Sequence, residues 1–118
     1  MARPPLLLAA AALAALALAA CGGDGGEGAG GKPPQQVVDA GRTAQGRQVF
    51  GRSCAACHGG DGGGGTGPRL AGEAAYTDPD VVVEQVRNGG GGMPAFSDRL
   101  SEQELADVSA FVVRELAR

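Results

Sequence analysis

Small and apolar side chains recur at helical spacing in three stretches: residues 44–53, residues 79–88, and from residue 102 to the C-terminus. Within each stretch they fall three or four residues apart, which places them on one face of a helix. Gly46 lies inside the first stretch and costs about 1 kcal/mol relative to Ala there, so we expect another helix to cross it closely. No stretch alternates apolar and polar residues as a half-buried strand does. The pattern therefore predicts an all-α fold of three to four short helices.

Local signals mark where these helices begin. Thr43 is the predicted N-cap of the first helix. Asp78 followed by Pro79 predicts an N-cap and a proline at the first helical position of the second. Ser101 and Glu104 have the spacing of a capping box, which predicts the start of the third.

The N-terminus carries a targeting pattern. Residues 6–20 are all Leu or Ala and follow Arg3, and this run is shorter than the ~20 residues a membrane-spanning helix needs. We therefore predict a secretory signal over residues 1–20. Its end, Leu18-Ala19-Ala20-Cys21, resembles the lipobox of bacterial lipoproteins. The resemblance implies cleavage before Cys21 and lipidation of its thiol, which anchors the protein on the periplasmic side of the cell membrane. An ordinary signal peptide and an uncleaved anchor helix are the alternatives.

The mature chain divides into a tether and a domain. Residues 21–36 follow the cleavage site, are rich in Gly and Pro, and cannot bury enough surface to fold. As a flexible tether they span roughly 20 Å. Residues 37–118 form the predicted domain, which is small for an apolar core of its own and holds three Phe and one Tyr. A large flat cofactor inside the domain would supply the missing core.

The net charge limits the classes of partner that the chain is expected to bind. Without residues 1–20, nine Lys and Arg remain against thirteen Asp and Glu, a net charge of −4. Nucleic-acid binding needs a basic patch, which the sequence does not provide. A protein that docks electrostatically is expected to present a basic face.

Residues 54–58 (CAACH) form a CxxCH motif, the pattern of c-type haem attachment. Cys54 and Cys57 are spaced to form two thioethers with one haem. His58 is the only histidine, and Met93 is the only methionine besides the initiator. We predict one covalent haem c with His58 and Met93 as axial ligands of its iron. A soft thioether opposite an imidazole raises the reduction potential.

A second group of residues orients the histidine. When His58 binds through Nε2, its Nδ1–H needs an acceptor that fixes the tautomer and the ring orientation. The carbonyl of Pro68 is the candidate, and the glycine-rich run at residues 59–67 leaves the backbone free to place it.

Other interpretations of the same residues stay open. Cys54 and Cys57 could form a thiol–disulfide pair, although that usually comes with a βαβ pattern. With His58 they could bind zinc, but a fourth ligand would then be needed. Met93 could be a core residue, and Pro68 could be only a turn residue.

The motifs together resemble class I (mitochondrial-type) cytochromes c, in the small bacterial monohaem branch. The resemblance covers residues 40–118 and adds three elements to CxxCH: the Gly46–Phe50 motif with its crossing partner Phe111, the Thr66–Leu70 loop, and the Gly92–Phe96 loop around Met93. It implies the cytochrome c fold, with the N- and C-terminal helices crossing around one haem. In this family the carbonyl that corresponds to Pro68 accepts a hydrogen bond from the proximal histidine.

The resemblance also implies a function. The expected role is one-electron transfer in an extracytoplasmic, membrane-associated respiratory chain, without catalysis. Expected partners are a quinol-oxidising complex and a terminal oxidase or reductase, which dock near Ala55 and Ala56 at the exposed haem edge. The alternative is a haem-based ligand-binding or sensor module with a labile sixth ligand. The glycine run at residues 89–92 suits that alternative, since it predicts a mobile loop around Met93.

Overall fold

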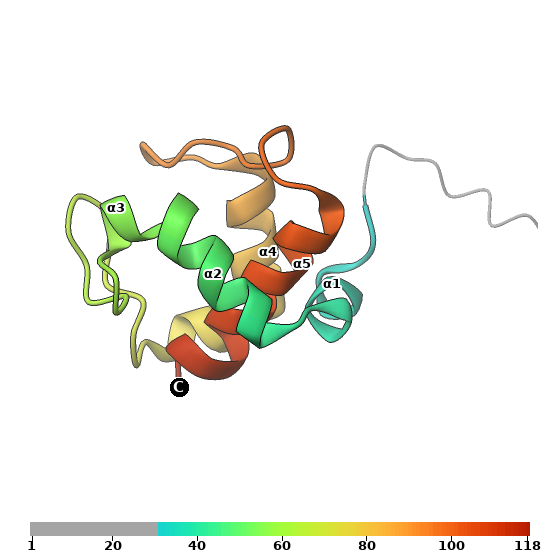
Figure 1. Ribbon diagram of the computed structural model, residues 1–118, viewed down its shortest axis with the longest axis horizontal. Coiled ribbons are helices and arrows are strands. Elements are labelled where there is room, and N and C mark those ends of the chain that lie inside the picture. The colour runs from blue at the N-terminus through green and yellow to red at the C-terminus, as the bar shows by residue number, and fades with distance from the viewer. Residues whose placement is uncertain (1–30) are drawn as a thin grey trace, which may run out of the picture.

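The computed structural model describes residues 31–118. The predicted signal peptide, the lipidated Cys21 and the tether as far as residue 30 lie outside the described residues. Within residues 31–118 the fold is all-α, as predicted, and two residues form the single isolated β-bridge (Figure 1). None of the helices in this part of the chain has the length and apolar character that crossing a membrane requires. The α-helices are α1 (Pro34–Ala40), α2 (Thr43–Ser53), α3 (Ala55–His58), α4 (Pro79–Asn88) and α5 (Glu102–Phe111).

Helices α2 and α5 cross at the centre of the molecule (Figure 1). At the crossing Gly46 faces the backbone carbonyl of Asp107, and a Cβ on Gly46 would overlap that carbonyl. The rings of Phe50 and Phe111 meet edge to face on the same side, with their centroids 5.6 Å apart. The expected close crossing over Gly46 is therefore confirmed.

The predicted starts of α4 and α5 are also confirmed. The Asp80 backbone N–H donates to Asp78 Oδ1 over 2.9 Å, which caps α4. At α5 the Glu104 backbone N–H donates to Ser101 Oγ, and the Ser101 N–H donates to the Glu104 carboxylate. Both partners of the capping box are thus satisfied.

The predicted N-cap of α2 is wrong. Thr43 is the first helical residue, and Arg42 takes the N-cap position without a side-chain cap. The Arg42 backbone N–H donates instead to Asp107 Oδ1 on α5, over 2.8 Å. A buried carboxylate from a distant helix replaces the local cap, and local sequence could not reveal that partner.

Asp107 is a buried carboxylate, 2% exposed, that joins the start of α2 to α5. The Arg42 guanidinium donates to both of its oxygens, and Gln103 Nε2 donates to Oδ1 over 2.8 Å. Burial alone would raise the pKa of Asp107, but these hydrogen bonds outweigh it and hold the pKa below its ordinary value. The carboxylate therefore stays charged at neutral pH.

Helix α1 was not predicted, and it moves the domain boundary. It begins at Pro34, three residues before the expected boundary at residue 37. A helix of this length has little stability of its own, so packing must stabilise it. Val37 and Val38 are buried, and α1 contacts α4 and α5. Ahead of it, the Lys32 carbonyl accepts a hydrogen bond from Arg87 Nη1 on α4.

Two short helical segments complete the described part of the chain. A 3₁₀ turn covers Ala74–Thr77, and the predicted single C-terminal helix instead ends in a π-helical turn, Val112–Leu116. That turn packs on the loop after α3, since the Leu116 carbonyl accepts a hydrogen bond from the Gly72 N–H. The end of the chain thereby supports the loop that follows CxxCH.

Candidate functional site

A cavity of about 410 Å³ opens between α2, α3, α4, α5 and two loops. Apolar side chains from three helices line it, including Phe50 of α2, Val82 and Val86 of α4, and Val108 of α5. No Lys, Arg, Asp or Glu is among its lining residues. A concave, apolar site with a few convergent polar groups is the usual form of a cofactor site.

Both cysteines of the motif line this cavity, at the start and on the last turn of α3. Cys54 is half-buried and Cys57 is exposed, and neither forms a disulfide. Burial, with a smaller contribution from the neighbouring Cys57, raises the pKa of the Cys54 thiol to about 11. Exchange-active dithiols have lowered pKa values, so the environment of Cys54 does not favour the thiol–disulfide interpretation.

His58 is buried, 7% exposed, and lines the same cavity. Its Nδ1 lies 2.9 Å from the Pro68 carbonyl, the contact that the resemblance implied. Because a carbonyl can only accept, Nδ1–H is the donor and Nε2 keeps its lone pair for a metal. Pro68 thus fixes the tautomer of the imidazole through its backbone.

The loop at residues 59–68 is attached closely to the motif. The Gly64 N–H donates to the His58 carbonyl over 2.7 Å, and the Gly67 N–H donates to the Cys57 carbonyl over 2.8 Å. Gly67 lies against the imidazole itself, since a Cβ there would be 2.9 Å from His58 Cε1. Sequence reasoning placed this glycine in the glycine-rich run and in the Thr66–Leu70 motif, but it missed the contact of the glycine with the histidine.

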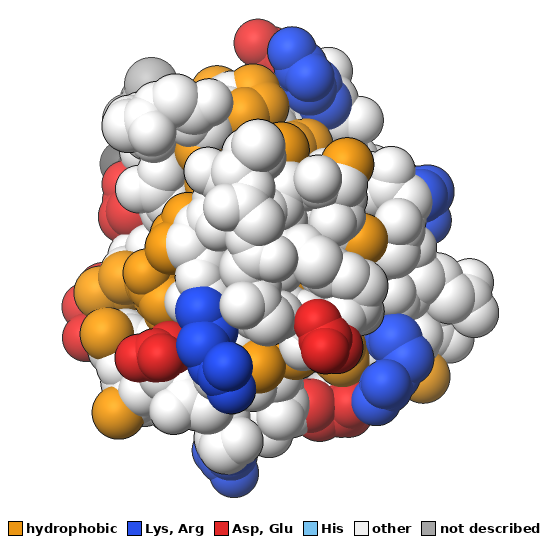
Figure 2. Space-filling view, turned by 90° about the vertical axis from the view of Figure 1, so that its left-hand side faces the viewer, with side chains coloured by type: hydrophobic (Ala, Val, Ile, Leu, Met, Phe, Trp, Pro, Cys, Tyr) orange, Lys and Arg blue, Asp and Glu red, His pale blue; other side chains and the backbone are white. Residues whose placement is uncertain are grey.

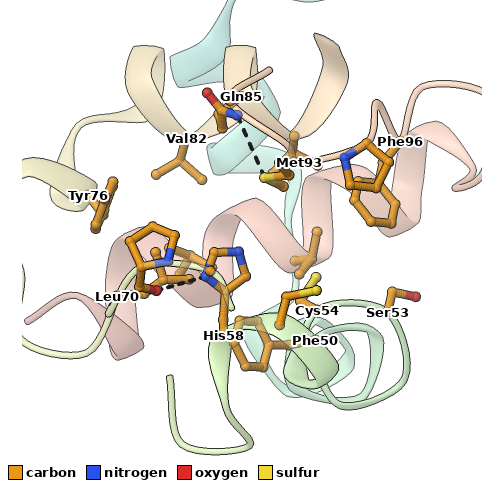
Figure 3. A pocket seen from close by; sticks show the side chains of 18 of the residues that line it. Phe50, Ser53, Cys54, His58, Leu70, Tyr76, Val82, Gln85, Met93 and Phe96 are labelled. Carbon is orange, nitrogen blue, oxygen red and sulfur yellow. Dashed lines mark hydrogen bonds between the residues drawn. The ribbon is translucent and has the colours of Figure 1, made fainter. Parts of the chain in front are cut away.

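Met93 lies on the other side of the cavity. Figure 3 shows Met93 and His58 entering the space from opposite sides. The Met93 sulfur is 3.7 Å from Gln85 Nε2, and Gln85 comes from α4. Sequence reasoning missed Gln85. The available signal was its spacing, because Gln85 follows the buried Val82 by three residues and so borders the apolar stripe of α4.

The donor set fits a c-type haem. Two thiols lie at one edge of an uncharged cavity, an imidazole with a fixed Nδ1–H faces it, and a thioether lies opposite. Among residues 31–118 no group of three or more His, Cys, Asp or Glu side chains is placed to hold a metal ion, so the described residues offer no zinc site of the expected kind.

A family comparison covers most of the domain. The family model described as "Cytochrome C oxidase, cbb3-type, subunit III" matches residues 41–112. Cytochrome c6 of Parathermosynechococcus lividus is 36% identical over 80 residues, which are 64% of this chain and 92% of the relative. The chloroplastic cytochrome c6 of Chlamydomonas reinhardtii is 41% identical over 85 residues, which are 66% of this chain and 57% of the relative.

Solved structures that resemble this chain are also cytochromes c. Cytochrome c6C from Synechococcus sp. PCC 7002 has a TM-score of 0.54 at 34% identity, over 62% of this chain and 95% of that one. Cytochrome cL from Hyphomicrobium denitrificans has a TM-score of 0.54 at 23% identity, over 65% of this chain and 48% of that one, and shows the fold alone. The chain therefore belongs to the family that this model describes, within the class I monohaem cytochromes c, and it carries electrons on one covalently bound c-type haem rather than acting as an enzyme.

Proposed function

We propose that this chain carries single electrons in a respiratory chain at the extracytoplasmic face of a bacterial membrane, with His58 and Met93 as the axial ligands of its haem iron. The observation that carries the proposal is that the two side chains face one uncharged cavity from opposite sides (Figure 3). When bound, the haem supplies the reversible change between Fe(II) and Fe(III).

On the proximal side, residues of the chain attach the haem and orient the imidazole that binds it. Cys54 and Cys57 provide the two thioether sulfurs, so the cofactor cannot dissociate when its charge changes. The hydrogen bond from His58 Nδ1–H to Pro68 fixes the imidazole with Nε2 as the metal ligand. Gly67 leaves room for the ring to reach that position.

On the distal side, residues of the chain raise the reduction potential of the haem and shield it from water. The Met93 thioether favours the reduced state of iron more than a second nitrogen ligand would. The apolar lining keeps water away, which favours the less charged state further. If His58 and Met93 both hold the haem, the same two side chains would serve both oxidation states, so little of the protein would have to rearrange and no exogenous ligand would be needed.

Membrane attachment depends on the N-terminal segment. The supporting features are the short Leu/Ala run at residues 6–20 and the lipobox-like end at Cys21. The signal peptide covers residues 1–20, and the tether runs from Cys21 to the start of α1 at Pro34. The anchored domain could then meet membrane-bound partners while held near the surface.

The proposed partners are a quinol-oxidising complex as donor and a terminal oxidase or reductase as acceptor. The description of the matching family, an oxidase subunit, supports the acceptor. Docking is proposed at the side that carries α3, where Ala56 and Cys57 are exposed. Figure 2 shows this side: backbone and uncharged side chains cover much of it, and acidic and basic side chains lie beside one another toward its lower part. Such a face suits a small, transient contact, which typically buries under about 1,200 Å² in total.

Potentiometry of the haem-loaded protein tests the proposed ligation. Met93→Ala should lower the reduction potential while the covalent haem is retained, because a soft ligand of Fe(II) has been removed. An unchanged potential would remove Met93 from the ligand set. The anchor is tested separately by membrane fractionation: Cys21→Ala should move the holoprotein out of the membrane fraction, and retention there would contradict lipidation at Cys21.

A further inference from the structure

The loop that carries Met93 is a hydrogen-bonded turn. The Gly90 N–H donates to the Met93 carbonyl over 2.9 Å, and the Met93 N–H donates to the Gly90 carbonyl over 3.1 Å. The two residues between them, Gly91 and Gly92, have φ values of 62° and 89°. A two-residue connection with positive φ at both positions is a type I′ turn, the geometry of tight β-hairpins. Met93 is therefore the last residue of a defined turn.

The turn is attached to α4 at several points. Gln85 Nε2 donates to the Gly90 carbonyl over 3.0 Å and also contacts the Met93 sulfur. At the base of the loop Gly89 is packed closely, since a Cβ there would lie 2.6 Å from the Ala95 nitrogen. Beyond the loop the Phe96 N–H donates to a carbonyl of α4 over 2.9 Å. Both ends of the loop are thus held on the helix that lines the cavity.

Packing does not shape the tip of this turn. Gly90, Gly91 and Gly92 are exposed, and a Cβ on any of them would meet nothing within 4 Å. All three also line the cavity, so among protein atoms the obstacle to a side chain there is the positive φ. For an L residue that backbone conformation is strained, and β-branched residues adopt it least readily. The glycines therefore serve the conformation of the turn.

We propose that the type I′ turn at residues 90–93, held on α4 by Gln85, is a positioning device that keeps the Met93 sulfur inside the cavity. It holds the sulfur at the sixth position and limits the population of states in which an exogenous ligand can enter. The turn thus opposes the labile, sensor-like behaviour that a glycine-rich loop would otherwise favour. The inference rests on the proposed role of Met93 as an axial ligand.

Three glycine variants of the haem-loaded protein separate turn geometry from general destabilisation. Gly91→Val forces a β-branched residue into the turn, whereas Gly91→Asn creates Asn-Gly, the preferred pair for a type I′ turn. Gly72→Val is the matched control, because Gly72 also has a positive φ, of 73°, with nothing within 4 Å of a Cβ, but lies in another loop. The two valine variants therefore carry the same kind of strain in different loops.

Two readouts are used: the rate at which CO binds the reduced protein, and hydrogen exchange of the Gly90 and Met93 amides. Gly91→Val should raise both by roughly tenfold, which corresponds to about 1.4 kcal/mol in the opening equilibrium. Gly91→Asn should stay within about twofold of the wild type, since its turn is retained. Gly72→Val should lower overall stability without changing either readout. Gln85→Leu removes the amide but leaves every residue of the turn unchanged, and it should raise the rate of CO binding by a smaller factor.

Equal effects of Gly91→Val and Gly72→Val would overturn the positioning role while leaving the ligation by Met93 intact. Failure of the proposed function is recognised differently. In that case Met93→Ala would leave both the optical spectrum and the rate of CO binding unchanged, and the positioning role would fall with it.

Discussion

The loop that orients His58, residues 59–68, and the loop that carries Met93, residues 89–96, are both glycine-rich but are held in different ways. In the first loop the glycines make close approaches: Gly67 lies against the imidazole, and Gly62 is buried against Leu116. In the second loop the tip is open to solvent, and the backbone conformation of the glycines defines the turn.

This difference shows that two glycine-rich loops of one site can need glycine for different physical reasons. In the loop at residues 59–68, Gly67 depends on space, because a Cβ there would strike the histidine, and Gly59, Gly62 and Gly64 have positive φ values as well. At the tip of the second loop a Cβ would meet no protein atom, so the positive φ values of Gly91 and Gly92 are the constraint there. We therefore expect the two loops to respond to different kinds of substitution, and the experiments below use that difference, from the largest expected effect to the smallest.

The largest effect is expected from the double variant Cys54→Ala/Cys57→Ala. Without both sulfurs the proximal loop has no covalent cofactor to position. The pyridine haemochrome assay should detect covalent haem in the wild-type protein and none in this variant. Covalent haem in the double variant would contradict the attachment at residues 54–58.

Space in the proximal loop is tested by Gly67→Ala. The added Cβ would lie 2.9 Å from His58 Cε1, so the ring or the loop must shift. We expect a loss of about 1–3 kcal/mol in the free energy of unfolding, measured by denaturant titration of the holoprotein. Gly60→Ala is the control, because a Cβ there meets nothing within 4 Å, and it should change stability by less than about 0.5 kcal/mol. Equal losses in the two variants would contradict the steric role of Gly67.

The contrast between the two loops also explains which parts of the site could be predicted from the sequence. That Cys54, Cys57, His58 and Met93 lie around one site could be predicted, because the role proposed for each demands a residue type that is scarce in this chain. The contact of Gly67 with the imidazole could not, since neither the glycine run nor the Thr66–Leu70 motif shows which glycine the fold brings against His58. The turn at residues 90–93 could not be predicted either, because composition carries no dihedral angles.

The helices also differ in whether the local sequence could predict where they begin. The starts of α4 and α5 were predictable because their caps are local, whereas the start of α2 depends on Asp107, which is 65 residues away from Arg42. Helix α1 has seven residues and no side-chain cap, so its stability depends on tertiary contacts, chiefly its packing on α4 and α5.

Asp107→Asn tests the buried carboxylate that joins the start of α2 to α5. The pKa of Asp107 lies below the ordinary value of 3.8, so the folded state binds fewer protons there than the unfolded chain does. Its contribution to stability is present at neutral pH and is lost as the pH falls below about 3.8, through the folded-state pKa. The difference in Tm between the wild type and Asp107→Asn should therefore shrink as the pH is lowered from 7 to about 2.

Asp39→Asn is the control for this series, because Asp39 is an exposed carboxylate whose ion pair with Arg114 lies on the surface. Its Tm difference from the wild type should be small at every pH. A Tm difference for Asp107→Asn that does not depend on pH would show that the charge of Asp107 contributes nothing.

The smallest effect is expected for Pro68→Ala. The acceptor for His58 Nδ1–H is the backbone carbonyl, which alanine retains. Only the stiffness of the ring is lost, so stability should fall by no more than about 1 kcal/mol and the optical spectrum should stay as in the wild type. A spectrum that reports a changed proximal ligand would show that the proline side chain itself matters.

The most direct measurement is the methionine-to-iron charge-transfer band of the oxidised holoprotein. Axial ligation by His58 and Met93 predicts that the wild type shows this band, that Met93→Ala lacks it, and that the remote variant Gly72→Val keeps it. Absence of the band from the wild-type protein, or its survival in Met93→Ala, would contradict that ligation.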